Sequence, residues 1–202
     1  MFSILRPYIF SLDPEVAHDL AIKSLKANIL PKSFFNVEDE EMLETNILGK
    51  TISWIGDINN MCASWIEASN IFGFKLHVSS PPQYKHLLEE LNINQSNVEY
   101  FADPLEACVQ SNLITTDVWT SMGFEREKIE RLKTFERWIV DRRKIDAANK
   151  DVVFMHCLPA HRGEEVSADV IDGPQSVVWQ EAENRLHFQK ALLEYLIKIN
   201  EA

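Results

Sequence analysis

The chain has 202 residues, of which 46% are hydrophobic and 25% are charged. This length suits one ordinary globular domain with an appendage and is too short for two full-sized domains. The 20 Lys and Arg residues against 31 Asp and Glu residues give a formal net charge of −11, which disfavours nucleic acid as a partner. Three scattered cysteines favour neither a disulfide framework nor a structural zinc site, and they predict a cytoplasmic protein. The sequence shows neither a secretion signal nor an apolar run near the roughly 18–20 residues of a membrane-spanning helix.

Residues 1–35 predict an amphipathic helical extension. Apolar residues crowd its first twelve positions, Asp13 before Pro14 is typical of a helix start, and Pro31 predicts the end of a second helix. The acidic run Glu38-Asp39-Glu40-Glu41 predicts a solvated linker over residues 36–49. A second, larger domain is therefore expected over residues 50–202.

From residue 50 onward, short apolar runs alternate with helical stretches. The predicted strands are 51–55, 75–79, 98–101, 113–116, 152–156 and 176–179, and the predicted helices are 61–72, 83–91, 104–110, 125–135, 141–149 and 181–199. This strict succession predicts an α/β fold with a doubly wound parallel sheet. Ligands of such folds bind outside the carboxyl ends of the strands, so the residues after each strand are the candidate site.

Polar residues follow four of the predicted strands. The first segment has one glycine and lacks the glycine-rich dinucleotide fingerprint, so we expect no nicotinamide cofactor. The set offers a carboxylate, amides, a hydroxyl, a thiol and a guanidinium, which suits a small zwitterion. The segments are Gly56-Asp57-Ile58-Asn59-Asn60-Met61, Asp117-Val118-Trp119-Thr120-Ser121-Met122-Gly123, His156-Cys157-Leu158-Pro159-Ala160-His161-Arg162 and Glu181-Ala182-Glu183-Asn184-Arg185.

Simpler interpretations stand beside this one. Asp57 and Asp117 can cap the following helix or turn, and Cys157 can be a small buried hydrophobe. Arg185 can pair with Glu181 one helical turn away. The charged residues between 125 and 133 are interpreted as a solvated helix face.

Two further chemistries are less favoured. Cys157 and His161 can form a nucleophilic dyad only if the fold brings them into contact. Zinc bound by His156, Cys157 and His161 would lack a second cluster of ligands.

The four polar segments resemble the successive signatures of ornithine carbamoyltransferase, in order and in spacing. The resemblance runs from about Gly49 to the C-terminus and includes His161-Arg162-Gly163-Glu164-Glu165-Val166. The sister enzyme acting on aspartate typically has Pro in place of Cys157 and lacks the Ser121-Met122-Gly123 loop, so the resemblance implies ornithine. It implies a Rossmann-like domain, and transfer of a carbamoyl group from carbamoyl phosphate to L-ornithine, giving L-citrulline and phosphate for arginine biosynthesis without a cofactor.

The resemblance also implies roles for individual residues. Cys157 and Arg185 would be catalytic, and together with Leu158 they would contact carbamoyl phosphate. The α-amino and α-carboxylate groups of ornithine would be held by Asn60, Asp117, Ser121 and Met122.

Two departures from the family pattern affect these expectations. Ile58 stands where the family usually has glycine, and if that turn needs a positive φ the residue costs about 1–3 kcal/mol and displaces Asn60. The family's phosphate-binding domain, with its Ser-Thr-Arg-Thr and His-Pro-Thr-Gln segments, has no counterpart in this sequence. We therefore expect the chain to be inactive unless a carbamoyl-phosphate domain is supplied, and the alternatives are a non-catalytic amino-acid-binding module and a chimera without function. The oligomeric state is not implied.

Residues 1–48 resemble a different family, the N-terminal helical extension of quinone-dependent dihydroorotate dehydrogenases. The resemblance rests on Leu5-Arg6-Pro7, Leu12-Asp13-Pro14-Glu15 and Ala17-His18. It implies a chimera, with peripheral membrane contact through residues 1–30 and without the flavin-binding barrel.

Overall fold

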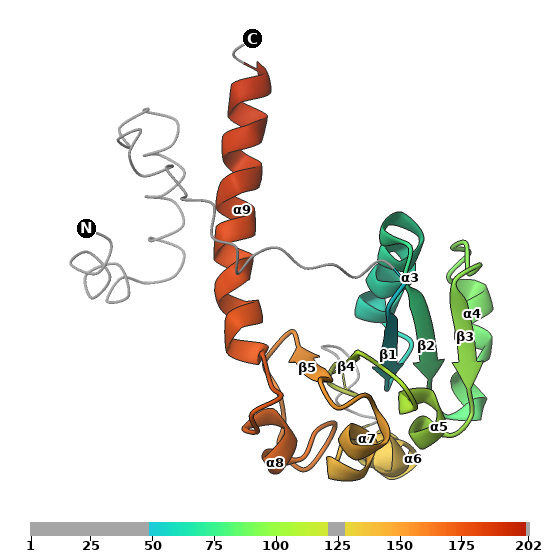
Figure 1. Cartoon of the computed structure of the whole chain (residues 1–202). Coiled ribbons are helices and arrows are strands. Elements are labelled where there is room, and N and C mark those ends of the chain that lie inside the picture. Colours follow the sequence, from blue (N-terminus) through green and yellow to red (C-terminus); the bar gives the residue numbers. More distant parts are fainter. Residues whose placement is uncertain (1–48, 121–127, 201–202) are drawn as a thin grey trace. The chain divides into compact units, whose positions relative to one another are not determined.

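The structure is a computed structural model that describes residues 49–120 and 128–200 (Figure 1). The predicted extension and most of the predicted linker lie outside these residues, as do Ser121 and Met122. One compact unit spans Glu44–Phe188, and Gln189–Ala202 belongs to another. The fold and the site described below lie in the first unit.

Five parallel strands form one sheet in the order β3-β2-β1-β4-β5. The strands are β1 Thr51–Ile55, β2 Lys75–Ser79, β3 Val98–Phe101, β4 Leu113–Thr116 and β5 Val153–His156. In the register, Ile55 is paired with Ser79, and Thr116 is paired with His156. The order reverses between β1 and β4, which confirms the predicted doubly wound parallel sheet.

Helices connect the strands near the predicted positions. They are α3 Asn60–Phe72, η3 Pro82–Tyr84, α4 His86–Glu90, α5 Pro104–Cys108, α6 Lys128–Phe135, η5 Glu136–Trp138, α7 Arg142–Ala147, α8 Ala168–Ile171 and α9 Val178–Asn200. The short helix α8 was not predicted. Within the described residues, no helix combines the length and the apolar character that a membrane span requires.

The predicted sixth strand at 176–179 is wrong. Only Ser176 pairs with the sheet, through an isolated bridge to Phe154. Val177 N donates to the Phe154 carbonyl at 2.9 Å, and α9 begins at the next residue. Burial of Val178 in the first turn of the helix overrides the local strand preference of consecutive valines.

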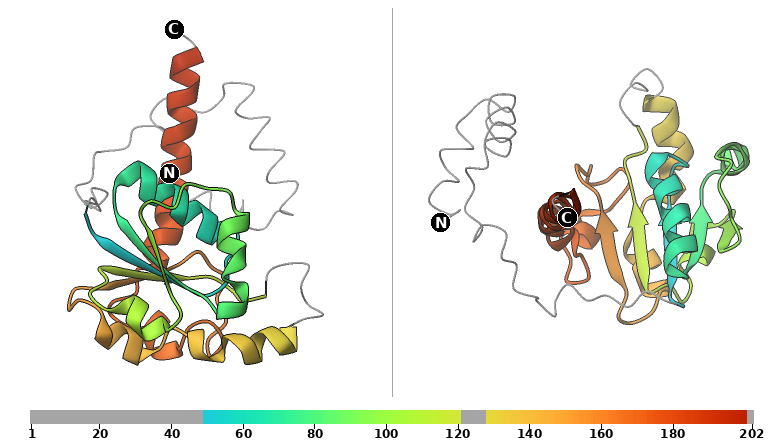
Figure 2. Two further views of the ribbon diagram at one scale, coloured as in Figure 1. Left: turned by 90° about the vertical axis from the view of Figure 1, so that its right-hand side faces the viewer. Right: turned by 90° about the horizontal axis from the view of Figure 1, so that it is seen from above.

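Two apolar cores cover the two faces of the sheet. Alternate residues of β1 and β2, such as Trp54 and Val78, pack with Ile66 of α3 and Leu88 of α4. Residues from α5, α6, η5, α7 and α8 pack on the opposite face (Figure 2). The side chains of α3 and α5 thus enclose the sheet and fix its strand ends for the site.

Candidate functional site

The site lies where β1 and β4 end side by side, since the chain leaves these neighbouring strands in opposite directions and opens a crevice there. Gly56 follows β1 with a φ of +143°. A Cβ atom on Gly56 would lie 3.2 Å from Thr116 Oγ1 and 3.6 Å from Trp119 Nε1. Glycine therefore allows the turns after β1 and β4 to approach each other.

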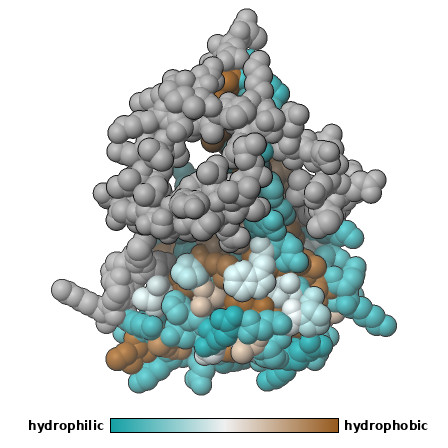
Figure 3. Space-filling model, turned by 90° about the vertical axis from the view of Figure 1, so that its left-hand side faces the viewer, coloured by the Kyte–Doolittle hydropathy of each residue, from teal (hydrophilic) through white to brown (hydrophobic). Residues whose placement is uncertain are grey.

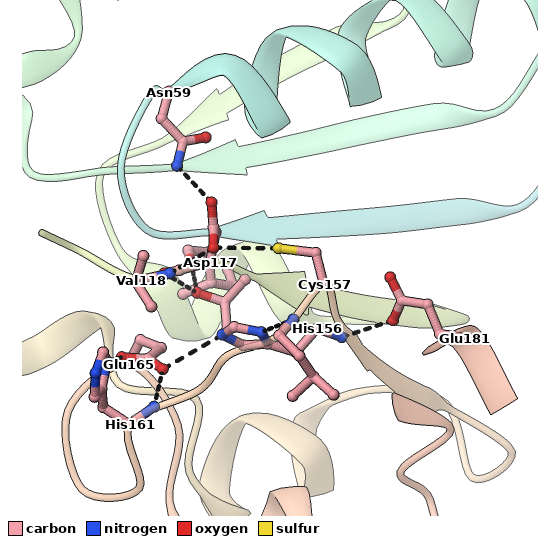
Figure 4. Close-up of polar contacts among 11 residues, drawn as sticks. Asn59, Asp117, Val118, His156, Cys157, His161, Glu165 and Glu181 are labelled. Atoms are coloured by element: carbon pink, nitrogen blue, oxygen red, sulfur yellow. Dashed lines mark hydrogen bonds and ion pairs between the residues drawn. The ribbon is translucent and has the colours of Figure 1, made fainter. Parts of the chain in front are cut away.

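Asp117 directly follows β4, and its carboxylate is at the centre of a group of polar contacts (Figure 4). Its Oδ2 accepts a hydrogen bond from Asn59 Nδ2 at 2.9 Å. Its Oδ1 accepts two hydrogen bonds, one from Cys157 Sγ at 3.2 Å and one from the backbone nitrogen of Val118 at 2.8 Å. These three donors, which come from the ends of β1, β4 and β5, orient the carboxylate. The carboxylate thus contacts the ends of three strands, and part of the turn that Asp117 could cap lies outside the described residues.

Asn59 also begins helix α3. Its Oδ1 accepts the Met61 and Cys62 N–H groups at 2.9 and 3.1 Å, so the helix cap and the contact to Asp117 use one amide. Asn60 is the exposed first residue of α3. Both amides belong to the polar segment predicted after the first strand. The structure places Asn59 against Asp117, whereas the family resemblance assigns the ornithine contact to Asn60.

The expectation of backbone strain at Ile58 is wrong, because Ile58 does not have a positive φ. Within the described residues, the positive φ values outside glycine belong to Asn92, Gln110 and Leu158. Ile58 is 6% exposed and packs in the core beside α3. A branched side chain fits this turn because it fills apolar space.

The Cys157 thiol is not activated as a nucleophile. Burial, and after it the neighbouring Asp117 carboxylate, which opposes the thiolate, raise the pKa of Cys157 to about 12. His161 faces elsewhere, with its Nδ1 3.8 Å from Glu165 Oε2. The less favoured Cys157–His161 dyad is therefore not formed, because the thiol and the imidazole have different partners and the thiol stays protonated at neutral pH.

Cys157, Leu158 and Arg185 line one open pocket of about 570 Å³. Trp179, at the start of α9, is 65% exposed and adds an apolar wall. On the face of the molecule drawn in Figure 3, apolar residues lie among hydrophilic ones. The structure thus brings together the three residues expected to contact carbamoyl phosphate.

Glu181, which the simpler interpretation pairs with Arg185, contacts the end of β5 instead. Its Oε2 accepts the His156 N–H at 2.9 Å and so ties α9 to the end of β5. Burial raises the pKa of Glu181, and the hydrogen bond from His156 partly opposes that rise. The exposed Arg185 side chain is left facing the pocket.

The charged residues between 125 and 133 were predicted to face solvent, and this prediction is wrong for Arg131 of α6. It is 8% exposed, pairs with Asp57, and donates from Nε to the Trp119 carbonyl at 2.6 Å. Asp57 is therefore part of a buried ion pair and does not cap α3. The sequence carries one signal for this burial, since Arg131 precedes the buried Phe135 by one helical turn.

Two groups of side chains have the atom types of metal ligands. Atoms of Asp117, His156 and Cys157 lie within 4.8 Å of one another, as do atoms of His161, Glu164 and Glu165. In the first group the thiol and the carboxylate are hydrogen-bonded to each other, and His156 Nδ1 accepts the Leu158 N–H at 2.9 Å. Each member of this first group thus has a hydrogen-bond partner within the protein.

A doubly wound parallel sheet with polar side chains at its switch point defines a Rossmann-like α/β domain. The sequence profile described as "Aspartate/ornithine carbamoyltransferase, Asp/Orn binding domain" matches residues 48–196. The chain belongs to this family.

Individual relatives agree with the family match. The ornithine carbamoyltransferase of Dechloromonas aromatica is 60% identical over 152 residues, which are 75% of this chain and 50% of that protein. That of Aromatoleum aromaticum is 59% identical over 153 residues, with the same coverage. The crystal structure of the Burkholderia thailandensis enzyme has a TM-score of 0.66 and 51% identity, covering 75% of this chain and 48% of that one. The chain thus spans about half the length of these relatives.

Proposed function

We propose that this chain supplies the L-ornithine side of the ornithine carbamoyltransferase reaction. The observation that carries this proposal is the oriented Asp117 carboxylate at the switch point of a domain from this family. The δ-amine of ornithine would attack the carbamoyl carbon of carbamoyl phosphate. A C–N bond forms, phosphate leaves with the electron pair of the C–O bond, and the amine loses a proton.

Asp117 would bind the α-ammonium group of ornithine. Each carboxylate oxygen has two lone pairs. Oδ1 already accepts from Cys157 and Val118, whereas among the described residues Oδ2 accepts from Asn59 alone and can still accept from an ammonium. Asn60, at the start of α3, would contact the α-carboxylate. Ser121 and Met122 complete the proposed set and lie outside the described residues.

Arg185, Cys157 and Leu158 would act on the carbamoyl group. The Arg185 guanidinium can stabilise the negative charge that develops on the carbamoyl oxygen in the tetrahedral intermediate. The protonated Cys157 thiol can position the reactants but is unsuited to attack them. Catalysis would therefore come from orientation and charge stabilisation, with ornithine as the nucleophile.

Calorimetry with the full chain tests the proposal. L-Ornithine should bind with 1:1 stoichiometry, and Asp117→Asn should weaken binding about tenfold or more because the ammonium loses its charged partner. Asp151→Asn, at an exposed position, is the matched control. Equal binding of L-aspartate, or no binding of L-ornithine, contradicts the proposal. Citrulline formation with added carbamoyl phosphate then separates a catalytic chain from a non-catalytic binding module.

We also propose that the chain is a chimera whose residues 1–30 contact membranes. The family match begins at residue 48, which supports a junction near that position. Flotation with liposomes of neutral and anionic composition tests the contact, and a protein that stays at the bottom of the gradient with both contradicts it. All three cysteines are free thiols, which supports the cytoplasmic location that we propose.

A further inference from the structure

A buried polar pair lies directly behind Cys157 and has no role in the chemistry above. His156, the last residue of β5, is 1% exposed, and Glu165 is 0% exposed. His156 Nε2 lies 3.3 Å from Glu165 Oε1 (Figure 4). Buried carboxylates and imidazoles are costly unless they have partners, so the partners of this pair indicate what it does.

Both members of the pair contact the backbone of the loop that carries Cys157. The Leu158 N–H donates to His156 Nδ1 at 2.9 Å, and the His161 N–H donates to Glu165 Oε1 at 2.5 Å. The two side chains therefore bridge the interior of the loop from Leu158 to His161. Leu158 has a φ of +53°, a conformation that a branched residue adopts only when its surroundings hold it there.

The contact to Leu158 bears on the tautomer of the neutral imidazole. A backbone N–H can only donate, so Nδ1 must present a lone pair, and the proton of the neutral ring then lies on Nε2. Nε2 faces the Glu165 carboxylate, which favours a proton at that position. Glu165 thus selects the Nε2–H tautomer, and that tautomer supplies the acceptor for Leu158.

We propose that His156 and Glu165 are positioning residues, which hold the Cys157–Leu158 turn in the pocket by fixing the His156 tautomer. The turn directs the Cys157 thiol to Asp117 and places Leu158 in the pocket with Arg185. The consequence for catalysis rests on the proposed function. The tautomer and the geometry of the turn do not, because they can be measured in the chain without ornithine or carbamoyl phosphate.

The first measurement needs no variant. Nitrogen-15 NMR of the histidine rings in the full chain should show His156 with a protonated Nε2 and an unprotonated Nδ1 at neutral pH. A His156 ring protonated on Nδ1 overturns the proposal, since Leu158 would then have no acceptor.

Two substitutions separate the two ring nitrogens. His156→Asn keeps an acceptor close to the position of Nδ1, whereas His156→Gln moves the amide toward the position of Nε2 and leaves the Leu158 N–H without an acceptor. The readout is alkylation of Cys157 by iodoacetamide in the native chain, since Cys62 and Cys108 are fully buried. The Gln variant should be alkylated about fivefold faster or more, and the Asn variant within about twofold of the original rate. Equal rates for both variants overturn the proposal.

Glu165→Met tests the second residue, because it fills the same space without an acceptor. A mixture of His156 tautomers and faster alkylation are expected, and an unchanged tautomer shows that Glu165 has no positioning role. The exposed His86→Asn is the control for loss of a histidine. Circular dichroism identifies any variant that fails to fold, in which case the tautomer of the unaltered chain still decides. If ornithine fails to bind the unaltered chain, the proposed function is contradicted while the tautomer and alkylation results keep their meaning.

Discussion

Arg131 and Asp57 form a buried ion pair that joins helix α6 to the turn after β1. Their side chains are only 9% and 13% exposed. Arg131 Nε also donates a hydrogen bond to the carbonyl of Trp119, which follows β4. Its guanidinium carbon lies 5.3 Å from the ring centroid of Tyr84 and 5.2 Å from that of Phe135. Burial raises the pKa of Asp57, and the positive charge of Arg131 only partly opposes that rise. One arginine thus connects the strand ends on both sides of the switch point.

We predict that Arg131→Met destabilises the protein by about 3–5 kcal/mol, because it leaves the Asp57 carboxylate buried without its charged partner. Urea denaturation measures the loss. Arg142→Met is the control, since the Arg142–Asp146 pair is exposed and should contribute less than about 1 kcal/mol. Similar losses of unfolding free energy in both variants would show that the buried ion pair of Arg131 contributes no more stability than an exposed pair.

Asp117→Asn should lower the pKa of Cys157 from about 12 toward the ordinary value of a thiol, since a negative neighbour is removed. The pH dependence of iodoacetamide alkylation reports this pKa. Each unit by which the pKa falls raises the thiolate fraction at pH 8 about tenfold. Asp151→Asn should leave the profile unchanged. A profile that does not move in Asp117→Asn would mean that burial alone determines the pKa.

Gly56→Ala should cost about 1–3 kcal/mol of stability, because Gly56 combines a positive φ with close contacts from Thr116 and Trp119. Gly163→Ala is the control, since Gly163 has a φ of +88° but open space around it. The difference between the two unfolding free energies isolates the crowding at Gly56. The prediction fails if Gly163→Ala costs as much as Gly56→Ala.

Glu181→Gln should become more stabilising as the pH rises. The folded-state pKa of Glu181 is raised above its unfolded value near 4.5, so ionisation costs stability once the pH exceeds that value. Glutamine can still accept the His156 N–H but does not ionise. Unfolding free energies at pH 4 and pH 8 should therefore show an advantage for the variant that grows with pH. A stability advantage that shrinks as the pH rises would mean that folding lowers the pKa of Glu181 and does not raise it.

The sequence predicted the parallel sheet and the region of the site because parallel strands bring their carboxyl ends to one edge. Asp117 and Cys157 are 40 positions apart, yet both follow strands, and the structure places them in contact. The false strand at 176–179 had the local composition of a strand but helical packing at Val178. Local preference could not anticipate that packing.

The buried charges could not be predicted in the same way. Arg131 and Asp57 are 74 positions apart, so the residues around Arg131 do not identify Asp57 as its buried partner. Glu165 similarly resembles its neighbour Glu164, but only Glu165 is fully buried. Whether a charged side chain is enclosed depends on distant partners that periodicity does not reveal.

Asn59 couples the start of α3 to the orientation of Asp117 through opposite ends of one amide. Aspartate at this position could still cap the helix, but it would place a second negative charge against Asp117 and could not donate. Serine is too short to serve both partners, and glutamine has a longer chain than the cap geometry accommodates. A primary amide at this chain length is therefore a chemical requirement, and the first turn of the helix cannot shift without turning the carboxylate.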